Sequence, residues 1–264
     1  MADTERREEG PDYSRRLLLT LAGAALVGAV LAGLARFHLT AAFDWPIQMV
    51  FNAPAQQSPL FDLAARSIDR FAMFQGVLLM SLAAGAFARC NGVERVRLVA
   101  CLFGASFAAV ISRLTQAMLP QNPRPLFDPA IDFRAPLGAD HEMIADWSSF
   151  PSDHAALLMG IALAIFVLRP RLGLLAAAIA FVGGMARIYG GAHYMSDTIA
   201  GWLIAATVVF SIAALKPKLT PRLSQIAYER RGFLAMAGFF IAVEAAYLYD
   251  DIRQFLSGIA KHLL

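Results

Sequence analysis

The chain has 264 residues, of which 58% are hydrophobic and only 16% are charged. A soluble globular domain has about 45–50% apolar and about 25% charged residues, so this composition excludes an ordinary soluble domain. The formal net charge of +3 does not indicate nucleic-acid binding, because the basic residues stand beside apolar runs, as topology signals do.

The apolar residues are gathered in runs that predict membrane-spanning helices. Such a helix needs about 20 predominantly apolar residues, and a shorter run can span with tilt or local thinning. The candidate runs are 17–35, 73–88, 98–119, 152–168, 172–189, 196–215 and 232–249. We therefore predict an all-α, polytopic membrane protein built as a bundle of about six to seven transmembrane helices.

Lysine and arginine counting predicts the orientation of this bundle. The segments richest in these residues are 1–16, 89–97, 169–171 and 216–231, and we place them inside. The N-terminus is then cytoplasmic and the C-terminus is outside. The outer segment 36–72 carries aromatic residues that suit one or two helices lying in the interface. The proline-rich outer segment 120–151 is expected to be ordered against the membrane surface.

Three short polar segments lie at the edges of the apolar runs, and this topology places all of them on the outer face. The first surrounds Arg124, which stands between two prolines that restrict its backbone. An interfacial anchor to lipid phosphate is the plainer reading of this arginine. Arg113 lies about two turns inside the preceding helix, where a charge is costly and indicates function, unless its side chain snorkels to the rim.

The second segment is Pro151-Ser152-Asp153-His154. Ser152 is a natural N-cap, and helix capping alone would explain it. A helix N-terminus also offers backbone N–H groups and a positive dipole end to an anion. His154, in the first turn, is then placed to face a bound anion.

The third segment contains Arg187, His193 and Asp197. The glycine pair 190–191 is expected to break the helix, so that the arginine and the histidine can converge. On a helical backbone His193 and Asp197 would share a face, and the carboxylate would orient the imidazole. A lone histidine here could be a satisfied polar residue, but its two charged neighbours favour a functional role.

A metal site is the main chemical alternative. The pair His141-Glu142, together with the residues above, could supply ligands. However, the chain lacks a His-Glu-x-x-His spacing, and arginines beside the histidines would oppose a divalent cation. We expect no metal and no other cofactor. Two arginines with two histidines suit an anion better.

These segments resemble the motifs of the type 2 phosphatidic acid phosphatase superfamily of integral membrane lipid phosphatases. The first family motif is a lysine, six residues and Arg-Pro; here Arg124 and Pro125 match, but Ala117 stands at the lysine position. The second, Pro-Ser-Gly-His, matches residues 151–154 with Asp153 in place of glycine. That aspartate resembles the bacterial undecaprenyl-diphosphate phosphatases of the superfamily and favours a polyprenyl diphosphate substrate.

The third family motif, Ser-Arg, five residues, His, three residues and Asp, matches at Arg187, His193 and Asp197 with Ala186 in place of serine. The resemblance implies a metal-free reaction in which His193 becomes a phosphohistidine, Asp197 orients it and His154 is the general acid and base. The residues expected to bind phosphate, together with backbone N–H groups near 152–154, are Arg124, Arg187, Ser152, Asp153 and Arg113. Arg113, or else the neutral Gln116, is expected to replace the missing lysine.

The expected domains are a cytoplasmic tail at 1–16, a transmembrane catalytic domain at 17–215, and a cytoplasmic loop with an extra helix at 216–264. The resemblance implies a lipid phosphatase of the bacterial cytoplasmic (inner) membrane, with its active site facing the periplasm or exterior. Its expected partners are a lipid phosphate substrate and membrane lipids, but no nucleic acid. A phosphotransferase and a non-catalytic lipid-phosphate binding or transport component stay open, as does the oligomeric state.

Overall fold

The computed structural model describes residues 40–70, 72–119, 121–138 and 147–214, with isolated positions outside these ranges. The helices are α2 (Ala41–Asn52), α3 (Pro59–Arg70), α4 (Gly76–Ala88), α5 (Gly92–Met118), α6 (Asp153–Phe166), α7 (Pro170–Tyr189) and α8 (Met195–Ala214), with short 3-10 turns η2 (Ala72–Phe74) and η3 (Pro125–Phe127). The described ranges contain no strand, and the all-α prediction is confirmed. The predicted first and last spans, 17–35 and 232–249, lie outside the described ranges except for isolated positions.

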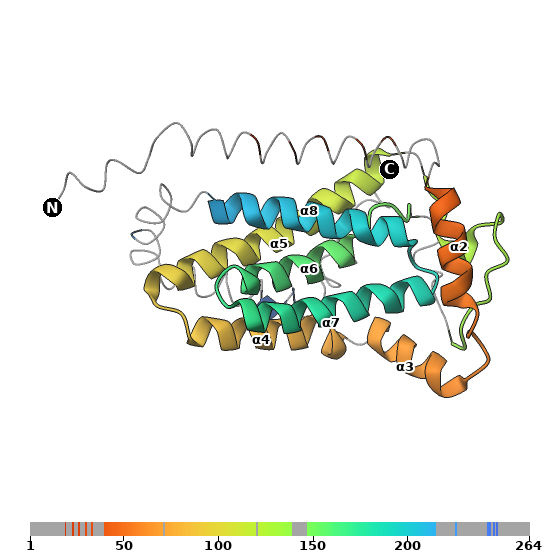
Figure 1. The fold of residues 1–264 in the computed structure, drawn as a ribbon, viewed down its shortest axis with the longest axis horizontal. Helices are drawn as coiled ribbons and strands as arrows, with labels where there is room; N and C mark the ends of the chain where they lie inside the picture. The colour runs from red at the N-terminus through yellow and green to blue at the C-terminus, as the bar shows by residue number, and fades with distance from the viewer. Residues whose placement is uncertain are drawn as a thin grey trace, which may run out of the picture.

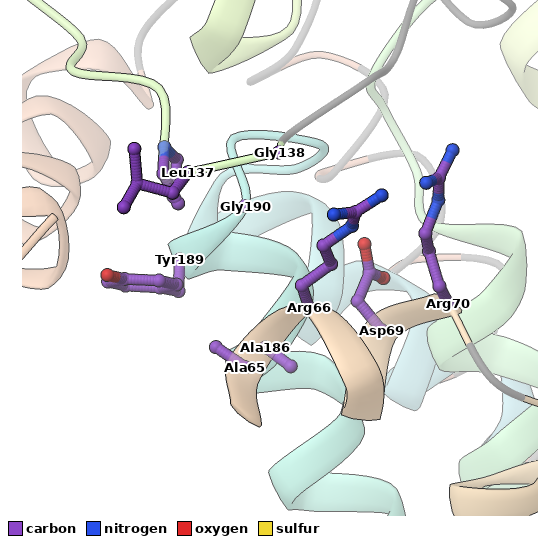
Figure 2. Close-up of a pocket in the computed structure, with 10 residues that line it drawn as sticks. Ala65, Arg66, Asp69, Arg70, Leu137, Gly138, Ala186, Tyr189 and Gly190 are labelled. Carbon is purple, nitrogen blue, oxygen red and sulfur yellow. The ribbon is translucent and has the colours of Figure 1, made fainter. Parts of the chain in front are cut away.

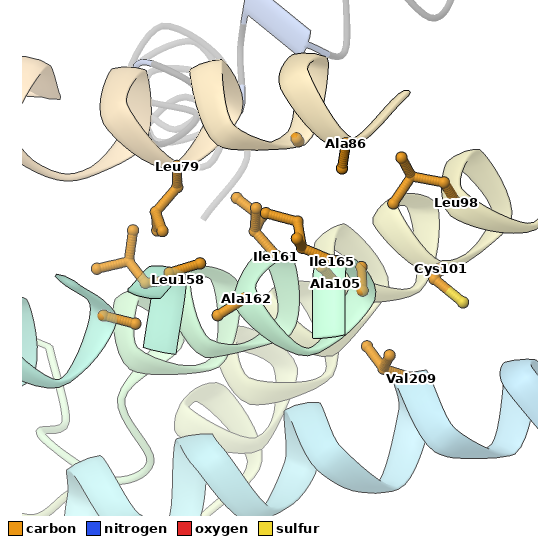
Figure 3. Close-up of a cluster of buried hydrophobic side chains, with 14 of the residues drawn as sticks. Leu79, Ala86, Leu98, Cys101, Ala105, Leu158, Ile161, Ala162, Ile165 and Val209 are labelled. Carbon is orange, nitrogen blue, oxygen red and sulfur yellow. The ribbon is translucent and has the colours of Figure 1, made fainter. Parts of the chain in front are cut away.

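Helix α6 is the centre of the bundle. It packs against α4, α5, α7 and α8, which lie roughly along one direction, while α2 and α3 lie at one end of the bundle (Figure 1). Buried side chains of α6, among them Leu158, Ile161 and Ile165, meet Leu79 of α4 and Ala105 of α5 in the apolar core (Figure 3). This packing places the first turn of α6, which carries the second polar segment (residues 151–154), among the neighbouring helices.

Among the described residues, three helices, α5, α7 and α8, are long and apolar enough to cross a membrane. The apolar helices α4 and α6 are shorter. The 14 residues of α6 extend about 21 Å, against a hydrocarbon core of about 30 Å. Because neighbouring helices cover most of α6, it has little need to match the lipid thickness along its own length.

Local signals explain where the helices begin. Helix α5 starts at Gly92, six residues before the predicted apolar run, because Asn91 and Glu94 form a capping box. Ser152 caps α6 as predicted, accepting a hydrogen bond from the Ala155 N–H at 3.3 Å. The α7 helix starts with Pro170 in its first turn, where the missing N–H costs nothing.

Helix α2 is attached to the end of the bundle by three buried polar residues at i, i+4 and i+8. Asp44 accepts hydrogen bonds from the Ser196 N–H at 2.9 Å and its hydroxyl at 2.6 Å. Gln48 Nε2 donates to the Ile188 carbonyl at 2.8 Å. Asn52 pairs with both backbone groups of Arg134. The segment 36–72 thus contains two helices, where one or two were expected, and α2 is joined to α7 and α8 by polar contacts.

The approach of α8 to the first turn of α6 depends on Gly201. A Cβ at this position would lie 2.4 Å from the Ser152 carbonyl oxygen and 3.0 Å from the Ala156 nitrogen. We therefore expect Gly201→Ala to separate the two helices and to destabilise the fold by about 1–3 kcal/mol. The unfolding midpoint of the detergent-solubilised protein should fall by several degrees.

Gly92→Ala is the matched control, because a Cβ there meets nothing within 4 Å and alanine favours a helix. Its unfolding midpoint should stay level or rise slightly. If both variants unfold at the wild-type temperature, the close contact at Gly201 does not restrict the bundle.

Candidate active site

The imidazole of His193 is the centre of the candidate site. It lies between α7 and α8 and is completely buried. Its Nδ1 atom is 2.8 Å from the Ser149 carbonyl oxygen, which can only accept a hydrogen bond. Nδ1 therefore carries the proton, and the lone pair is on Nε2, 3.3 Å from Nη1 of Arg124.

The expected direct hydrogen bond between His193 and Asp197 is not formed. The Asp197 Oδ2 atom lies 3.7 Å from Nδ1 and accepts the Tyr194 N–H at 2.7 Å. The reason is local, since His193 precedes the first residue of α8 and its backbone is not helical. The Ser149 carbonyl orients the ring, and Asp197 places a buried carboxylate beside it.

The environment of His193 favours the neutral imidazole. Burial lowers the pKa of His193 well below its ordinary value, and the positive charges of Arg124 and Arg187 lower it further. A neutral ring with its lone pair on Nε2 is the form in which histidine acts as a nucleophile.

The guanidinium of Arg124 is buried and fixed by backbone carbonyls. It donates to the carbonyls of Trp147 at 3.2 Å, Ser148 at 3.3 Å and Ala192 at 2.7 Å. Burial, and then the positive charge of Arg187, lower the pKa of Arg124 to about 10. Only 3% of this residue is exposed, which does not suit an anchor on the membrane surface.

The first turn of α6 lies next to α8 through a hydrogen bond from the Ser152 N–H to the Asp197 carbonyl at 3.0 Å. Asp153 Oδ1 accepts the His154 N–H at 2.9 Å and lies 3.1 Å from His154 Nδ1. Two of the backbone N–H groups expected to bind phosphate are therefore already bonded within the protein. Because a carboxylate has no hydrogen to donate to phosphate, the geometry of Asp153 suits holding His154.

Arg187 forms an ion pair that the motifs did not predict. Its Nη1 donates to Asp69 Oδ1 of α3 at 2.8 Å, and both side chains are close to fully buried. Its Nε is buried and has no hydrogen-bond partner among the described residues. The signal that could have pointed to Asp69 is its spacing of seven residues from Asp62, which places both on one face of α3.

Arg113 and Gln116 form one connected pair instead of two alternatives for the missing lysine. Arg113 Nη1 donates to Gln116 Oε1 at 2.8 Å, and Gln116 Nε2 donates to the Pro151 carbonyl at 2.6 Å. The guanidinium of Arg113 also lies 3.6 Å from the centre of the Trp147 ring. Ala117 is exposed. The pair therefore contacts the segment just before α6 at Trp147 and Pro151, and this segment borders Arg124 and Ser152.

Given the lipid phosphatase activity that the motifs imply, we expect Arg113→Ala to lower phosphate release by about 3- to 30-fold, the range of a partly desolvated cation–π contact. Loss of the contact should loosen Trp147, whose carbonyl binds Arg124. Arg95→Ala is the matched control: Arg95 lies 5.0 Å from the Phe87 ring, near the start of α5. Unchanged turnover in Arg113→Ala would contradict a supporting role for Arg113.

The metal alternative depended partly on His141-Glu142, which lie outside the described residues. In the ranges that the structure describes, no group of three or more His, Cys, Asp or Glu side chains could hold a metal ion. Near the site, a small open pocket lies between α3, residues 136–138 and the end of α7 (Figure 2). Asp69 lines this pocket and also contacts Arg187.

Residues 119–221 match the family model of the PAP2 superfamily. This part of the chain is similar to the PAP2 superfamily. It contains the three polar segments but excludes α2, α3 and Arg113. The match confirms the resemblance of the motifs to the type 2 phosphatidic acid phosphatase superfamily.

Two relatives extend the comparison. The bacitracin transport permease protein BcrC of Bacillus licheniformis is 37% identical over 73 residues, which are 28% of this chain and 36% of that protein. The match thus spans about a third of the length of that relative. The crystal structure of a transmembrane PAP2-type phosphatidylglycerolphosphate phosphatase from Bacillus subtilis superimposes with a TM-score of 0.52. It covers 75% of this chain and 96% of that chain at 20% identity, and so supports a PAP2 fold.

Proposed function

We propose that this chain is a metal-independent lipid phosphatase that acts through a phosphohistidine on Nε2 of His193. The observation that carries the proposal is the pair of contacts made by the two ring nitrogens of His193. Its Nδ1 hydrogen points at the Ser149 carbonyl, and its Nε2 lone pair faces the Arg124 guanidinium. A nucleophile beside a fixed cation suits attack on a phosphate group.

In the proposed first step, Nε2 of His193 attacks phosphorus while the bond from phosphorus to the lipid oxygen breaks. His154 donates a proton to that leaving oxygen. In the second step, His154 removes a proton from water, the water oxygen attacks phosphorus, and the bond from phosphorus to Nε2 breaks. Inorganic phosphate leaves, and both histidines return to their first states.

The remaining residues act on the charge of the phosphoryl group. Arg124 and Arg187 are proposed to bind its oxygens, and the Ser152 hydroxyl to donate to one of them. The buried Nε of Arg187, which has no partner in the described ranges, offers a donor for such an oxygen. Asp153 is proposed to orient His154, and Asp197 to stabilise the His193 cation as it forms.

The proposed location is the bacterial cytoplasmic membrane, with the N-terminus inside and the site facing outward. Lysine and arginine counting supports this orientation, and the apolar helices α5, α7 and α8 support the membrane setting. We propose a polyprenyl diphosphate as the preferred substrate, on the resemblance of residues 151–154. The PAP2-type phosphatidylglycerolphosphate phosphatase supports the broader class of lipid phosphates.

The transport name of the BcrC relative keeps a non-catalytic lipid-phosphate component as a second candidate. Phosphate release from the detergent-solubilised protein separates the two. Undecaprenyl diphosphate, phosphatidate and phosphatidylglycerol phosphate should each be supplied, with and without EDTA. EDTA-sensitive release would contradict the metal-free mechanism, and no release from any of them would favour the binding component. Turnover only with an added acceptor would indicate a phosphotransferase.

A further inference from the structure

Helix α3 brings a carboxylate to the candidate phosphate site from outside the PAP2 segment 119–221. Asp69 Oδ1 accepts a hydrogen bond from Arg187 Nη1 at 2.8 Å. The Asp69 side chain is 9% exposed and that of Arg187 is 11% exposed. Because both are largely withdrawn from water, this ion pair is screened less than a surface pair.

The position of Asp69 does not depend on this ion pair alone. One face of α3 also carries Asp62, which is fully buried and accepts a hydrogen bond from the Tyr189 hydroxyl. Asp62 also accepts the N–H groups of Leu137 at 2.9 Å and Gln56 at 3.1 Å. The bond from Tyr189 attaches α3 to the end of α7, where Arg187 is located, and the other two attach it to neighbouring backbone. Asp69 is therefore presented to Arg187 by a helix that is anchored elsewhere.

The ion pair uses one part of the Arg187 guanidinium and leaves another part for a ligand. Nη1 is bonded to Asp69, whereas the buried Nε has no partner among the described residues. A buried N–H without a partner is unfavourable, and an anion oxygen would satisfy it. The guanidinium is planar, so fixing Nη1 also sets the direction in which Nε–H points.

The carboxylate has an electrostatic effect as well. The positive charge of Arg187 disfavours the charged form of Arg124 nearby. A carboxylate bonded to Arg187 offsets part of this repulsion while the site holds no anion. Asp69 thus reduces the repulsion between two arginines that lie in one buried region.

We propose that Asp69 is a positioning residue for phosphate binding, acting by holding and orienting Arg187. This inference rests on the proposed phosphatase function. It places part of the phosphate-binding apparatus on α3, which the family segment does not include. Asp69 itself does not touch the substrate phosphate.

The test compares Asp69→Ala, Arg187→Ala and the double variant by phosphate release from undecaprenyl diphosphate. We expect Asp69→Ala to lower kcat/KM by about 10- to 100-fold, the scale of a misplaced binding group. The loss should appear more in kcat than in KM, because charge on the phosphoryl oxygens develops in the transition state. Asp69→Asn, whose carbonyl can still accept from Nη1, should recover part of the loss. In the Arg187→Ala background, Asp69→Ala should cause no further loss.

Asp62→Ala is the matched control, because Asp62 lies on the same helix but contacts Tyr189 instead of Arg187. It should lower the unfolding temperature, and because Asp62 also holds the Leu137 and Gln56 N–H groups, part of its effect on activity should persist in the Arg187→Ala background. The inference is overturned if Asp69→Ala keeps wild-type kcat/KM, or if its loss is equally large with and without Arg187.

Failure of the proposed function would be recognised separately. If the wild-type protein releases no phosphate from any lipid tested, inorganic phosphate binding to the same variants by titration calorimetry becomes the readout. Weaker binding in both single variants, with no further weakening in the double variant, supports the inference. Wild-type affinity in Asp69→Ala overturns it.

Discussion

Replacing His193 with alanine is expected to reduce phosphate release by more than about 1,000-fold, because the proposed reaction loses its nucleophile. Nε2 of His193 has its lone pair directed toward Arg124, and the opposite ring nitrogen is bonded to the Ser149 carbonyl. No other described histidine has this geometry. Phosphate release from undecaprenyl diphosphate by the purified variant is the direct measurement.

A phosphoenzyme-trapping experiment with labelled substrate sharpens this prediction. His154→Ala retains the nucleophile, so it should still form an acid-labile phosphoenzyme from an aryl phosphate, whose leaving group needs little protonation. It should then hydrolyse this intermediate slowly, since the second step lacks its base. His193→Ala should form no phosphoenzyme. Labelling of His193→Ala at the wild-type level would assign the nucleophile to another residue.

Replacing Arg124 with alanine should lower kcat/KM by about 100- to 1,000-fold, the effect of removing a fixed donor that stabilises transition-state charge. Arg124→Lys should recover little of this loss. The guanidinium reaches the carbonyls of Trp147, Ser148 and Ala192 at once, and a single ammonium group cannot reproduce that planar arrangement. Steady-state kinetics with the lipid substrate measure both variants.

Arg134→Ala is the control for this second prediction. Arg134 belongs to the same loop between α5 and α6, is exposed, and contacts Asn52 through its backbone groups. Its replacement should leave kcat/KM within about twofold, as expected for a surface residue away from the site. Equal losses in Arg124→Ala and Arg134→Ala would indicate a general effect of loop charge and contradict a specific role for Arg124.

The helices were largely predictable because their signals are local. Pro170 and the glycine pair 190–191 bound α7, and Gly191 adopts a φ of +76°, which ends the helix as expected. The predicted start of α5 lies six residues too late, because the prediction followed the beginning of the apolar run. The capping residues Asn91 and Glu94 lie before the apolar run and extend the helix into a polar turn.

The candidate site was predictable as a set of residues but not as a set of bonds. The motifs and the positive-inside count placed Arg124, His154 and His193 on one face, and the structure brings their segments together at one end of the bundle. The contact of Asp153 with His154 was missed, because the family pattern has glycine at that position. The sequence could not decide whether Arg113 or Gln116 replaces the missing lysine, because the two side chains bond to each other in the structure.

The sequence by itself determined the membrane character, the helical class and the residue types available for phosphate chemistry. These properties depend on composition, periodicity and short spacings. Only the tertiary structure decided which atom orients His193 and which carboxylate binds Arg187. Both partners are distant in the chain: the Ser149 carbonyl is 44 residues from His193, and Asp69 is 118 residues from Arg187. A backbone carbonyl is present at every residue, so sequence alone carries no signal for the one that helix packing selects.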